Sequence, residues 1–469
     1  MRYAAVGDAL ITRRVTRWGG AAYDGLLAVL RSADARVANL EVSFPNGAGA
    51  PAAGWSGTYL AAPAGCLGDL VAMGFNLFAR ANNHAGDWGP EGVLETSRAC
   101  DAAGVCHAGA GRDLAEARLP AYLDLPAGKV ALLAVATATQ GAGYRAGLRR
   151  HDSPGRPGAN CLRYEEYAVV PPQAMARLRA LVARTKVDQV RRYEVALGFR
   201  APDPEGVLSI GPVKFREGRR AGEAWEVNQR DVDEILRHVR DARRQADAVL
   251  LSFHAHEMAG GDPDAVPAFH RQFCRLCIEA GCDAVIGHGP HRLRGIEVYR
   301  GRPIFYSLGN FIFQNEEAEG LPADFYERLG LDPLLATPAD GFDRRNSRGE
   351  GGFAADRAYW ETVIAWWEAE AGRLREIRLY RSRWASGSRA RAAAVRCSLA
   401  VRRRAPSSPA WTVCAGRSGP AWSGTGAGTV SCAGRMVPDV ARAARTTPGA
   451  QRAAGRPVSR TRTRAGASS

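Results

Sequence analysis

The sequence has no run of about 18 consecutive apolar residues, the least that a helix needs to cross a membrane. The start of the chain also lacks the basic and apolar segments of a secretory signal peptide, because a strand-like run begins almost directly after Met1. Cysteine pairs are scarce as well, since the ten cysteines include only one C-x-x-C spacing, at Cys274 and Cys277. These absences predict a soluble, cytoplasmic protein with reduced thiols and no membrane segment.

The single C-x-x-C pair predicts a structural role for its thiols. The apolar residues around it recur with the spacing of an amphipathic helix that packs on a sheet: Phe269, Phe273, Leu276 and Ile278. A zinc or redox site would need a loop or a second cysteine pair. We therefore interpret the two cysteines as small buried side chains of a helix.

Acidic residues are almost absent from the C-terminal part of the chain. Residues 381–469 contain 17 of the 63 basic residues, all of them arginine, and one of the 48 acidic residues, Asp439. Residues 1–380 therefore hold 46 basic and 47 acidic residues and are nearly neutral, although the net charge of the chain is +15. The bulk charge of residues 1–380 predicts no polyanionic partner, so any binding of nucleic acid would depend on the tail alone.

The apolar periodicity of the sequence also ends near Tyr380. Ala, Arg, Gly, Ser and Pro dominate beyond it, a composition that buries too little apolar surface to offset chain entropy. We predict one folded domain over residues 1–380 and a disordered, low-complexity tail over residues 381–469. The tail is either a basic arm that contacts nucleic acid or the product of a shifted reading frame.

Strand-like and helix-like segments alternate within residues 1–380. Arg2–Val6, Ala35–Leu40 and Phe75–Ala79 have the pattern of buried strands, with helix-like segments between them. This alternation predicts a layered α/β core whose sheet is parallel in one half. Residues 139–230 interrupt it and are rich in Arg, Gly and Pro, so we predict a cap or lid over the catalytic face, with one helix at Pro172–Arg184 and with Arg156 as a candidate substrate contact.

Side chains that bind metals follow five of the expected strands. They are Asp8; Glu41; the group Asn83, His84 and Asp87; the group His254, His256 and Glu257; and the pair His288 and His291. Ligand sites in open α/β sheets gather at the carboxyl ends of strands, so this pattern indicates a metal site there. Two alternatives stay open: His288 and His291 are ordinary loop histidines, and the Asn83–Asp87 group is a capped turn before a helix that begins at Pro90.

These fragments together resemble a known family. The chain carries GD at residues 7–8, NLE at 39–41, NNHxxD at 82–87, HxHE at 254–257 and GHGPH…EVYRGRPIFYSLGNFIF at 287–313. This set is similar to the CapA / poly-γ-glutamate capsule synthesis family of the calcineurin-like metallophosphoesterase superfamily, over roughly residues 1–380. The resemblance implies an α/β sandwich of two mixed sheets flanked by helices. It also implies a metal-dependent hydrolase with an anionic small-molecule or polymer substrate, linked to poly-γ-glutamate or a similar capsule polymer.

The resemblance further implies a role for each candidate residue. Asp8 would bind a first divalent ion, Glu41 would bridge two ions, Asn83, His254 and His288 would bind the second, and His256 or His291 would return to the first. His84, oriented by Asp87, would contact the substrate oxyanion or protonate the leaving group. Glu257 would hold a ligand histidine in its tautomer, and Asn310 is a second candidate substrate contact. Mixed nitrogen and oxygen ligands suit Mn, Mg, Fe or Zn.

The chain departs from the superfamily pattern at two positions. Asp8 is followed by Ala9 and Leu10 where many members have Asp-x-His, and the second-strand carboxylate is Glu41 where the usual residue is Asp. Either His256 replaces the missing ligand or the site holds a single metal. The alternative function is a non-catalytic scaffold with structural metals that binds an anionic polymer or partner enzymes.

Overall fold

The computed structural model describes residues 1–15, 18–54, 57–139, 142–383, 398–402 and 411–413. All of them belong to one compact unit, Met1–Thr429, and the second unit, Val430–Ser469, lies outside the described residues. Among the described residues, no helix has the length and the apolar character needed to cross a membrane.

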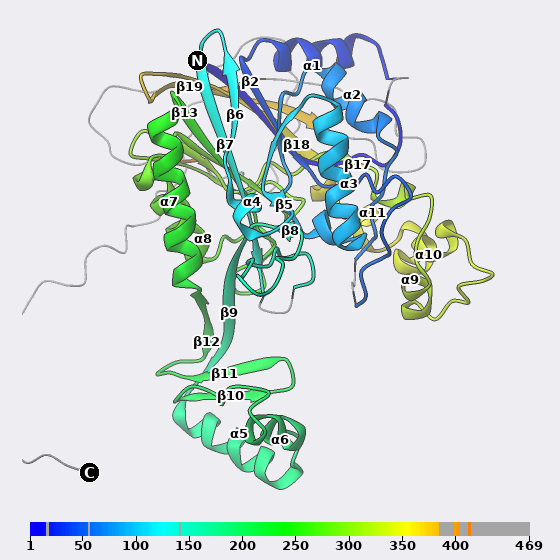
Figure 1. The fold of residues 1–469 in the computed structure, drawn as a ribbon, viewed down its shortest axis with the longest axis vertical. Coiled ribbons are helices and arrows are strands. Elements are labelled where there is room, and N and C mark those ends of the chain that lie inside the picture. The colour runs from blue at the N-terminus through cyan, green and yellow to red at the C-terminus, as the bar shows by residue number, and fades with distance from the viewer. Residues whose placement is uncertain (16–17, 55–56, 140–141, 384–397, 403–410, 414–469) are drawn as a thin grey trace, which may run out of the picture. The chain divides into compact units, whose positions relative to one another are not determined.

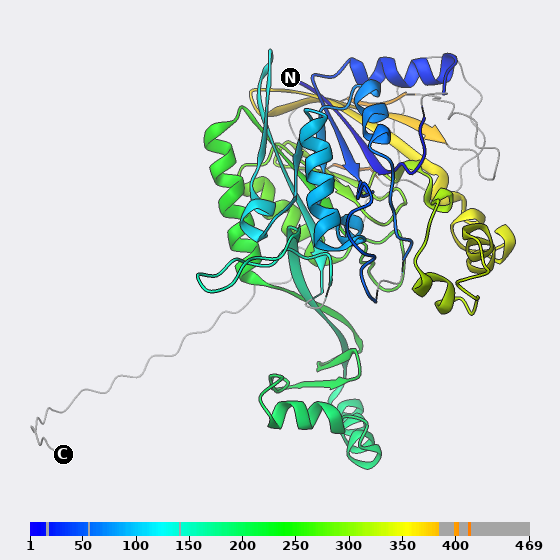
Figure 2. The same cartoon turned by 45° about the vertical axis from the view of Figure 1, so that its right-hand side comes forward.

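Two β-sheets face each other between two layers of helices (Figures 1 and 2). The first sheet has the order β20-β19-β18-β1-β2-β3-β4, with β17 also paired to β1. Its strands are β1 (Arg2–Leu10), β2 (Ala35–Leu40), β3 (Leu77–Ala79), β4 (Cys106–Ala108), β17 (Asn310–Phe313), β18 (Glu361–Glu370), β19 (Arg373–Arg383) and β20 (Ser398–Arg402).

The second sheet has the order β10-β11-β9-β7-β13-β14-β16-β15-β21, with β12 paired to β9 and β6 paired to β7. Its strands are β6 (Ala121–Leu125), β7 (Gly128–Ala138), β9 (Cys161–Val170), β10 (Val207–Ile210), β11 (Val213–Glu217), β12 (Gly222–Val227), β13 (Ala248–His254), β14 (Ala284–His288), β15 (Ile296–Tyr299), β16 (Arg302–Phe305) and β21 (Trp411–Val413). A separate small ladder joins β5 (Ala110–Gly111) to β8 (Gly158–Ala159).

The helices of the described chain are α1 (Ala21–Arg31), α2 (Gly65–Met73), α3 (Gly89–Ala102), α4 (Leu114–Arg118), α5 (Pro172–Thr185), α6 (Gln189–Ala196), α7 (Gln229–Gln245), α8 (Ala268–Ala280), α9 (Ala323–Arg328), α10 (Pro338–Arg345) and α11 (Gly352–Ala355). Short 3₁₀ turns lie at η1 (Asn83–Gly86), η2 (Asn315–Glu317), η3 (Ser347–Gly349) and η4 (Arg357–Trp360).

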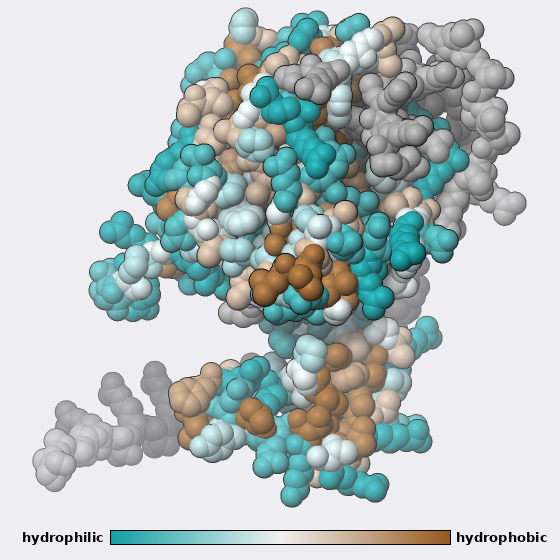
Figure 3. Space-filling model, turned by 90° about the vertical axis from the view of Figure 1, so that its right-hand side faces the viewer, coloured by the Kyte–Doolittle hydropathy of each residue, from teal (hydrophilic) through white to brown (hydrophobic). Residues whose placement is uncertain are grey.

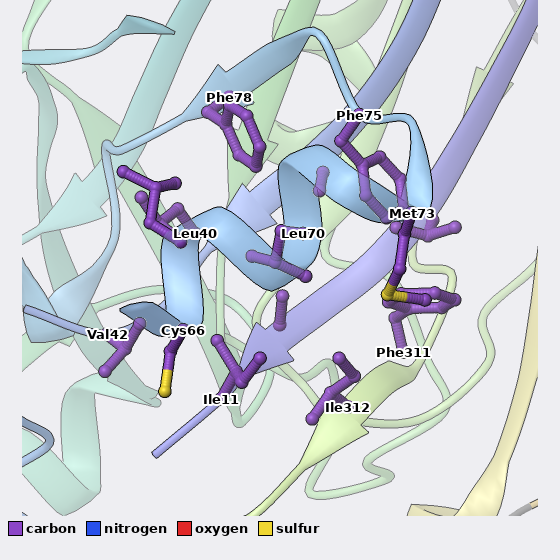
Figure 4. Close-up of a cluster of buried hydrophobic side chains, with 14 of the residues drawn as sticks. Ile11, Leu40, Val42, Cys66, Leu70, Met73, Phe75, Phe78, Phe311 and Ile312 are labelled. Carbon is purple, nitrogen blue, oxygen red and sulfur yellow. The ribbon is translucent and has the colours of Figure 1, made fainter. Parts of the chain in front are cut away.

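Three apolar clusters hold the layers together. Val37 of the first sheet packs with Leu132 and Leu250 of the second in the cluster between the sheets. On the outer face of the first sheet, Met73 of α2 lies beside Phe311 in a cluster that also contains Leu70 (Figure 4). On the outer face of the second sheet, side chains of α7 and α8 pack against β13 and β14. This four-layer α/β sandwich of mixed sheets confirms the fold class that the sequence predicts.

Several segment predictions agree with the structure and others need correction. The strand Ala35–Leu40 and the helix at Pro172 are present, and Cys274 and Cys277 are buried free thiols of α8. The first strand does not end at Val6 but continues to Leu10, because β17 pairs with its last residues. Asp8 therefore lies inside a strand, as do His254 and His288.

The predicted cap at residues 139–230 contains more regular structure than the sequence indicates. Strand β9 pairs with β7 near Cys161 and with β11 near Ala168, so it leads from the second sheet into a smaller group of elements. We call residues 171–221 the appended lobe; it contains α5, α6, β10 and β11, and Met175, Val182 and Leu208 are buried in a cluster of their own there. The segment around Tyr144 packs against Gly86 beside the turn that contains His84.

Parts of the predicted tail are strands. Residues 381–383 complete β19, β20 pairs with β19, and β21 pairs with β15. The remaining residues of the predicted tail lie outside the described residues.

Candidate metal centre

The carboxylate of Asp8 lies at the meeting point of the two sheets and is fully buried. Its Oδ1 accepts a hydrogen bond from Asn39 Nδ2 at 2.9 Å and lies 3.3 Å from His288 Nδ1. Its Oδ2 accepts a hydrogen bond from Gly289 N at 3.2 Å and lies 3.1 Å from His291 Nδ1. Parallel pairing of β1 with β2 and β17, and of β13 with β14, brings these groups to one edge.

The second buried carboxylate, Glu41, directly follows β2. Its Oε2 accepts a hydrogen bond from Asn39 Nδ2 at 3.1 Å, whereas its buried Oε1 has no hydrogen-bond partner among the described residues. Three imidazole nitrogens surround Oε1: His291 Nε2 at 3.7 Å, His84 Nε2 at 3.8 Å and His254 Nε2 at 4.0 Å. A buried carboxylate oxygen without a donor costs free energy, and a cation among these nitrogens would remove that cost.

The Nε2 atoms of His254 and His256 face each other and the side-chain oxygen of Asn83. His254 Nε2 lies 2.8 Å from Asn83 Oδ1 and 3.0 Å from His256 Nε2, and His256 Nε2 lies 3.3 Å from the same Asn83 oxygen. Both ring nitrogens of the buried His288 lack a hydrogen bond within the described chain. Lone pairs crowded in this way suit metal coordination, since each ligand offers an electron pair to the same ion.

Two groups of three residues place their ligand atoms within 4.8 Å of one another: Glu41 with His256 and His291, and Asp8 with Glu41 and His254. Glu41 belongs to both groups, which is the arrangement that a bridging ligand has. All these residues except His256 are buried. The residues present therefore fit one or two divalent ions. Asn83, beside His254, and His288, beside Asp8, are further candidate ligands.

The protonation of the site favours a cation as well. Burial, with a further contribution from His256, lowers the pKa of His254 well below its usual range. Desolvation and the neighbouring His291 lower the pKa of His256 to about 3, even though part of this residue is exposed. Both imidazoles are thus neutral near pH 7, as metal ligands must be.

The two carboxylates have opposite pKa shifts. Burial would raise the pKa of Asp8, but the imidazoles of His288 and His291 outweigh it and hold that pKa well below its usual value. Burial and the nearby Asp8 raise the pKa of Glu41 well above its usual value. A cation next to Glu41 would reverse this second shift because it stabilises the ionised carboxylate.

The loop between β14 and β15 has a shape that needs its glycine. A Cβ at Gly289, whose φ is +113°, would lie 2.9 Å from the backbone nitrogen of Ala255. His291 has a φ of 57°, an uncommon conformation for a residue other than glycine. Such backbone strain persists where the surroundings impose it, which is frequent at functional sites.

The carboxylate of Asp87 holds the ring of His84. The His84 Nδ1 atom lies 2.7 Å from Asp87 Oδ2, and the same carboxylate accepts a hydrogen bond from Leu60 N at 2.8 Å. Asn82 caps the η1 turn by accepting a hydrogen bond from His84 N. The segment is therefore a capped turn, and it also orients His84 toward Glu41. The interpretation as a capped turn and the interpretation as part of the site do not exclude each other.

Three predicted site residues have contacts that differ from the expected ones. Glu257 does not hold a candidate ligand: its Oε2 accepts a hydrogen bond from Thr137 and lies 2.9 Å from Nε2 of His270 in α8. Asn310 is buried, donates to the backbone oxygens of His291 and Tyr359, and its Oδ1 lies 2.9 Å from His291 Nδ1, which favours positioning His291 over contacting substrate. Arg156 is exposed and donates to the backbone oxygen of Arg145.

Two asparagines of the site belong to the family motifs but received no site role from the sequence. The Asn39 amide lies within hydrogen-bonding distance of Asp8, Glu41 and His254, and Asn82 donates to Asn39 Oδ1 at 3.2 Å. A signal for Asn39 exists, since residues two apart on a strand share a face and Asn39 lies two before Glu41. Asn82 opens the NNHxxD motif, but its bonds to Asn39 and Leu40 cannot be read from the sequence, because these partners are distant in the chain.

The fold and this cluster define the class: a four-layer α/β sandwich with carboxylate, amide and imidazole ligands at the edge where its two sheets meet. Residues 2–315 match the family described as "Bacterial capsule synthesis protein PGA_cap", and the chain belongs to this family.

Relatives support the assignment. The uncharacterized proteins y4sH and y4uA of Sinorhizobium fredii are each 37% identical to this chain over 388 residues, 80% of this chain and 81% of the relative. The PGA biosynthesis protein CapA of Bacillus subtilis is 40% identical over 83 residues, 18% of this chain and 21% of the relative. A probable polyglutamine synthesis accessory protein of Mycobacterium tuberculosis is 27% identical over 282 residues, 58% of this chain and 54% of the relative.

Proposed function

We propose that this protein is a metal-dependent hydrolase that cleaves a phosphoester or an amide in an anionic substrate. The observation that carries the proposal is the Oε1 atom of Glu41, which is buried, has no hydrogen-bond donor among the described residues and is surrounded by nitrogens of His84, His254 and His291. This arrangement supports a cation at the place where both sheets end.

One or two ions would be held by Asp8, Glu41, Asn83, His254, His256, His288 and His291. When bound, a divalent ion supplies Lewis-acid polarisation of a phosphoryl or carbonyl oxygen and lowers the pKa of water. Asn39 orients both carboxylates through its amide, and Asn310 fixes the ring of His291. Arg156, which is exposed, is a candidate contact for a negatively charged substrate.

His84 is the proposed acid or base of the reaction. Its Nδ1 atom faces the Asp87 carboxylate, so the Nδ1–H tautomer is favoured and Nε2 points toward the cluster. The Nε2 atom is thus placed to exchange a proton with the substrate oxyanion or the leaving group. Asp87 stabilises the protonated ring when that proton is gained.

The names of relatives suggest the substrate class. The Bacillus subtilis relative is named for PGA biosynthesis, and the Mycobacterium tuberculosis relative for polyglutamine synthesis. We propose an anionic polymer of this kind, or a phosphorylated precursor, as the substrate or partner of this chain.

A non-catalytic scaffold is the second candidate. The word "accessory" in the name of the Mycobacterium tuberculosis relative favours it. In that case the ion would join the two sheets, and the surface near it would bind an anionic polymer or a partner enzyme without turnover.

Turnover measurements separate the two candidates. Purified protein reloaded with Mn²⁺ or Zn²⁺ is given aryl phosphomonoesters, aryl phosphodiesters and γ-glutamyl peptides. For the hydrolase, His84→Asn lowers kcat about 10²–10⁴-fold while bound metal is retained, and Glu41→Gln loses both. His238→Asn, in α7 outside the site, is the matched control and leaves kcat unchanged. Turnover that survives both site substitutions removes the hydrolase proposal, and metal binding with no turnover on any substrate favours the scaffold.

A further inference from the structure

The appended lobe exposes a dense group of apolar side chains. Those exposed between residues 181 and 199 are Leu181, Val187, Val190, Tyr193, Leu197 and Phe199, with Phe199 at 83% and Val190 at 72% exposure. In the described chain outside the lobe, no stretch of that length exposes more than two large apolar side chains. The lower part of Figure 3, which is the lobe by its place in Figure 1, shows brown atoms on its surface. Contiguous exposed apolar surface marks an interaction site.

The two helices of the lobe present these side chains outward. Helix α6 has no buried residue, and Val190, Tyr193 and Leu197 recur three and four positions apart, which places them on one helical face. Helix α5 buries Met175 and Val182 in the lobe's own core and exposes the opposite face. The exposed apolar surface is therefore not the uncovered core of an incomplete lobe.

Positive charge accompanies this apolar surface. Residues 171–221 contain 11 basic and 5 acidic residues, whereas the other residues of 1–380 contain 35 basic and 42 acidic ones. The ion pairs within 171–221 join Asp203, Asp188 and Glu194 to Arg191, Arg192 and Arg200, respectively. Within the described chain, the cations of the lobe without an ion pair include Arg177, Arg184, Lys186, Arg219 and Arg220.

Cationic and apolar side chains share the outer face of α5. Arg177, Leu181 and Arg184 are exposed and follow one another at four and three positions, so they lie on the same side of the helix. Lys186 and Val187 continue the pattern in the turn toward α6. An interfacial helix has this combination, with apolar groups that enter a bilayer boundary and cations that contact its head groups.

We propose that the appended lobe docks on an anionic lipid surface. Val190, Tyr193 and Phe199 enter the boundary between head groups and acyl chains. Arg177, Arg184 and Lys186 contact the negatively charged head groups, each contributing attraction that depends on salt. A second copy of the chain would bring two positive surfaces together, and a nucleic acid would leave the apolar side chains in water, so neither fits as well.

Co-sedimentation of the full chain with lipid vesicles tests the proposal. We expect binding to vesicles of phosphatidylcholine mixed with phosphatidylglycerol, and at least about tenfold weaker binding to pure phosphatidylcholine. The triple variant Val190→Ser, Tyr193→Ser, Phe199→Ser is expected to bind the anionic vesicles about tenfold more weakly or worse, because these side chains lose the apolar area that enters the bilayer. Arg177→Glu with Arg184→Glu is expected to have a comparable effect that vanishes at high salt.

The matched control is Leu334→Ser with Leu335→Ser, which removes two strongly exposed apolar side chains from the loop between α9 and α10. This variant is expected to bind as the wild type does. The arginine-rich residues 381–469 are present in every protein compared, so binding through them alone would leave the triple variant unchanged. That result overturns the proposal. Equal binding of the wild type to neutral and anionic vesicles, or an equal loss of binding in the control variant, overturns it too. So does a dimer of the chain that the triple variant abolishes.

Discussion

At the scale of single residues, the side-chain amide of Asn39 contacts several groups of the site at once. Its one amide nitrogen lies 2.9 Å from Asp8 Oδ1, 3.1 Å from Glu41 Oε2 and 3.3 Å from His254 Nδ1. Its oxygen in turn accepts a hydrogen bond from Asn82. Asn39 thereby sets the distance between two carboxylates that would otherwise repel each other.

Asn39→Leu is expected to weaken metal binding about 10–100-fold, the usual effect of removing a residue that orients metal ligands. The reason is that both carboxylates lose their shared donor while the side-chain volume stays similar. Isothermal titration calorimetry with Mn²⁺ or Zn²⁺ measures the change. Asn76→Leu is the control, since Asn76 contacts Arg36 and Asp34 away from the site. Equal affinities of Asn39→Leu and wild type would show that the amide does not position the ligands.

The raised pKa of Glu41 predicts that metal binding releases a proton. Without metal, burial and Asp8 keep this carboxyl protonated at pH values where an exposed Glu is ionised, whereas a bound cation requires the carboxylate. The affinity for metal is therefore expected to rise with pH, by about tenfold per pH unit in the range where binding displaces one proton. His256, with its pKa lowered to about 3, is already neutral between pH 5 and 8 and adds no proton in that range. Calorimetry in buffers of different ionisation enthalpy counts the protons. An affinity that does not change with pH, together with no proton released at any pH tested, contradicts the assignment.

At the scale of elements, the loop from His288 to His291 joins the two sheets at the site. Gly289 N donates to Asp8, and Ala255 N donates to the backbone oxygen of His288. The loop thus connects β14 both to β1 and to the end of β13. Its geometry depends on the close approach of Gly289 to the backbone of Ala255.

Gly289→Ala is expected to destabilise the protein by about 1–3 kcal/mol more than a glycine substitution without a clash. Gly301→Ala is the matched comparison, because Gly301 also has a positive φ of +76° but its Cβ would meet nothing within 4 Å. Urea unfolding of both variants isolates the steric contribution. The same cost for both would mean that the loop yields easily and does not hold the ligands rigidly.

The elements also explain which parts of the structure follow from the sequence. The sequence shows β2 as an apolar run followed by Glu41, and β13 as an apolar run that ends at His254. Both are visible because a buried strand leaves a local run of apolar residues in the sequence. The continuation of β1 to Leu10 is not visible, since it depends on pairing with the end of β2 and with β17 some 300 residues later. The partners of Glu257 and Asn310 were missed for the same reason: His270 and Tyr359 are close only in the folded chain.

At the scale of the whole molecule, the candidate ligands come from both sheets. Asp8 and Glu41 belong to the first sheet and its edge, and His254 and His288 end strands of the second. The two sheets otherwise meet through an apolar cluster. A bound cation would therefore link the layers of the sandwich, and its removal would affect the whole fold.

Chelation is expected to lower the melting temperature of the wild type by several degrees. A ligand that binds only the folded state stabilises it by about 4 kcal/mol at a concentration of about 1,000 times Kd. Differential scanning calorimetry with and without EDTA measures the shift. Glu41→Gln serves as the control, since it is expected to show no shift on adding either metal or EDTA. A wild-type melting temperature that ignores both would mean that no ion connects the sheets.

Metal analysis of purified protein tests the central claim most directly. Wild-type protein incubated with Mn²⁺ or Zn²⁺ and freed of excess metal is expected to retain one or two equivalents per chain, and Glu41→Gln to retain fewer. Wild type that retains no metal would contradict the proposal that Glu41 and its surrounding histidines form a metal centre. A Glu41→Gln variant that retains as much metal as wild type would contradict it as well.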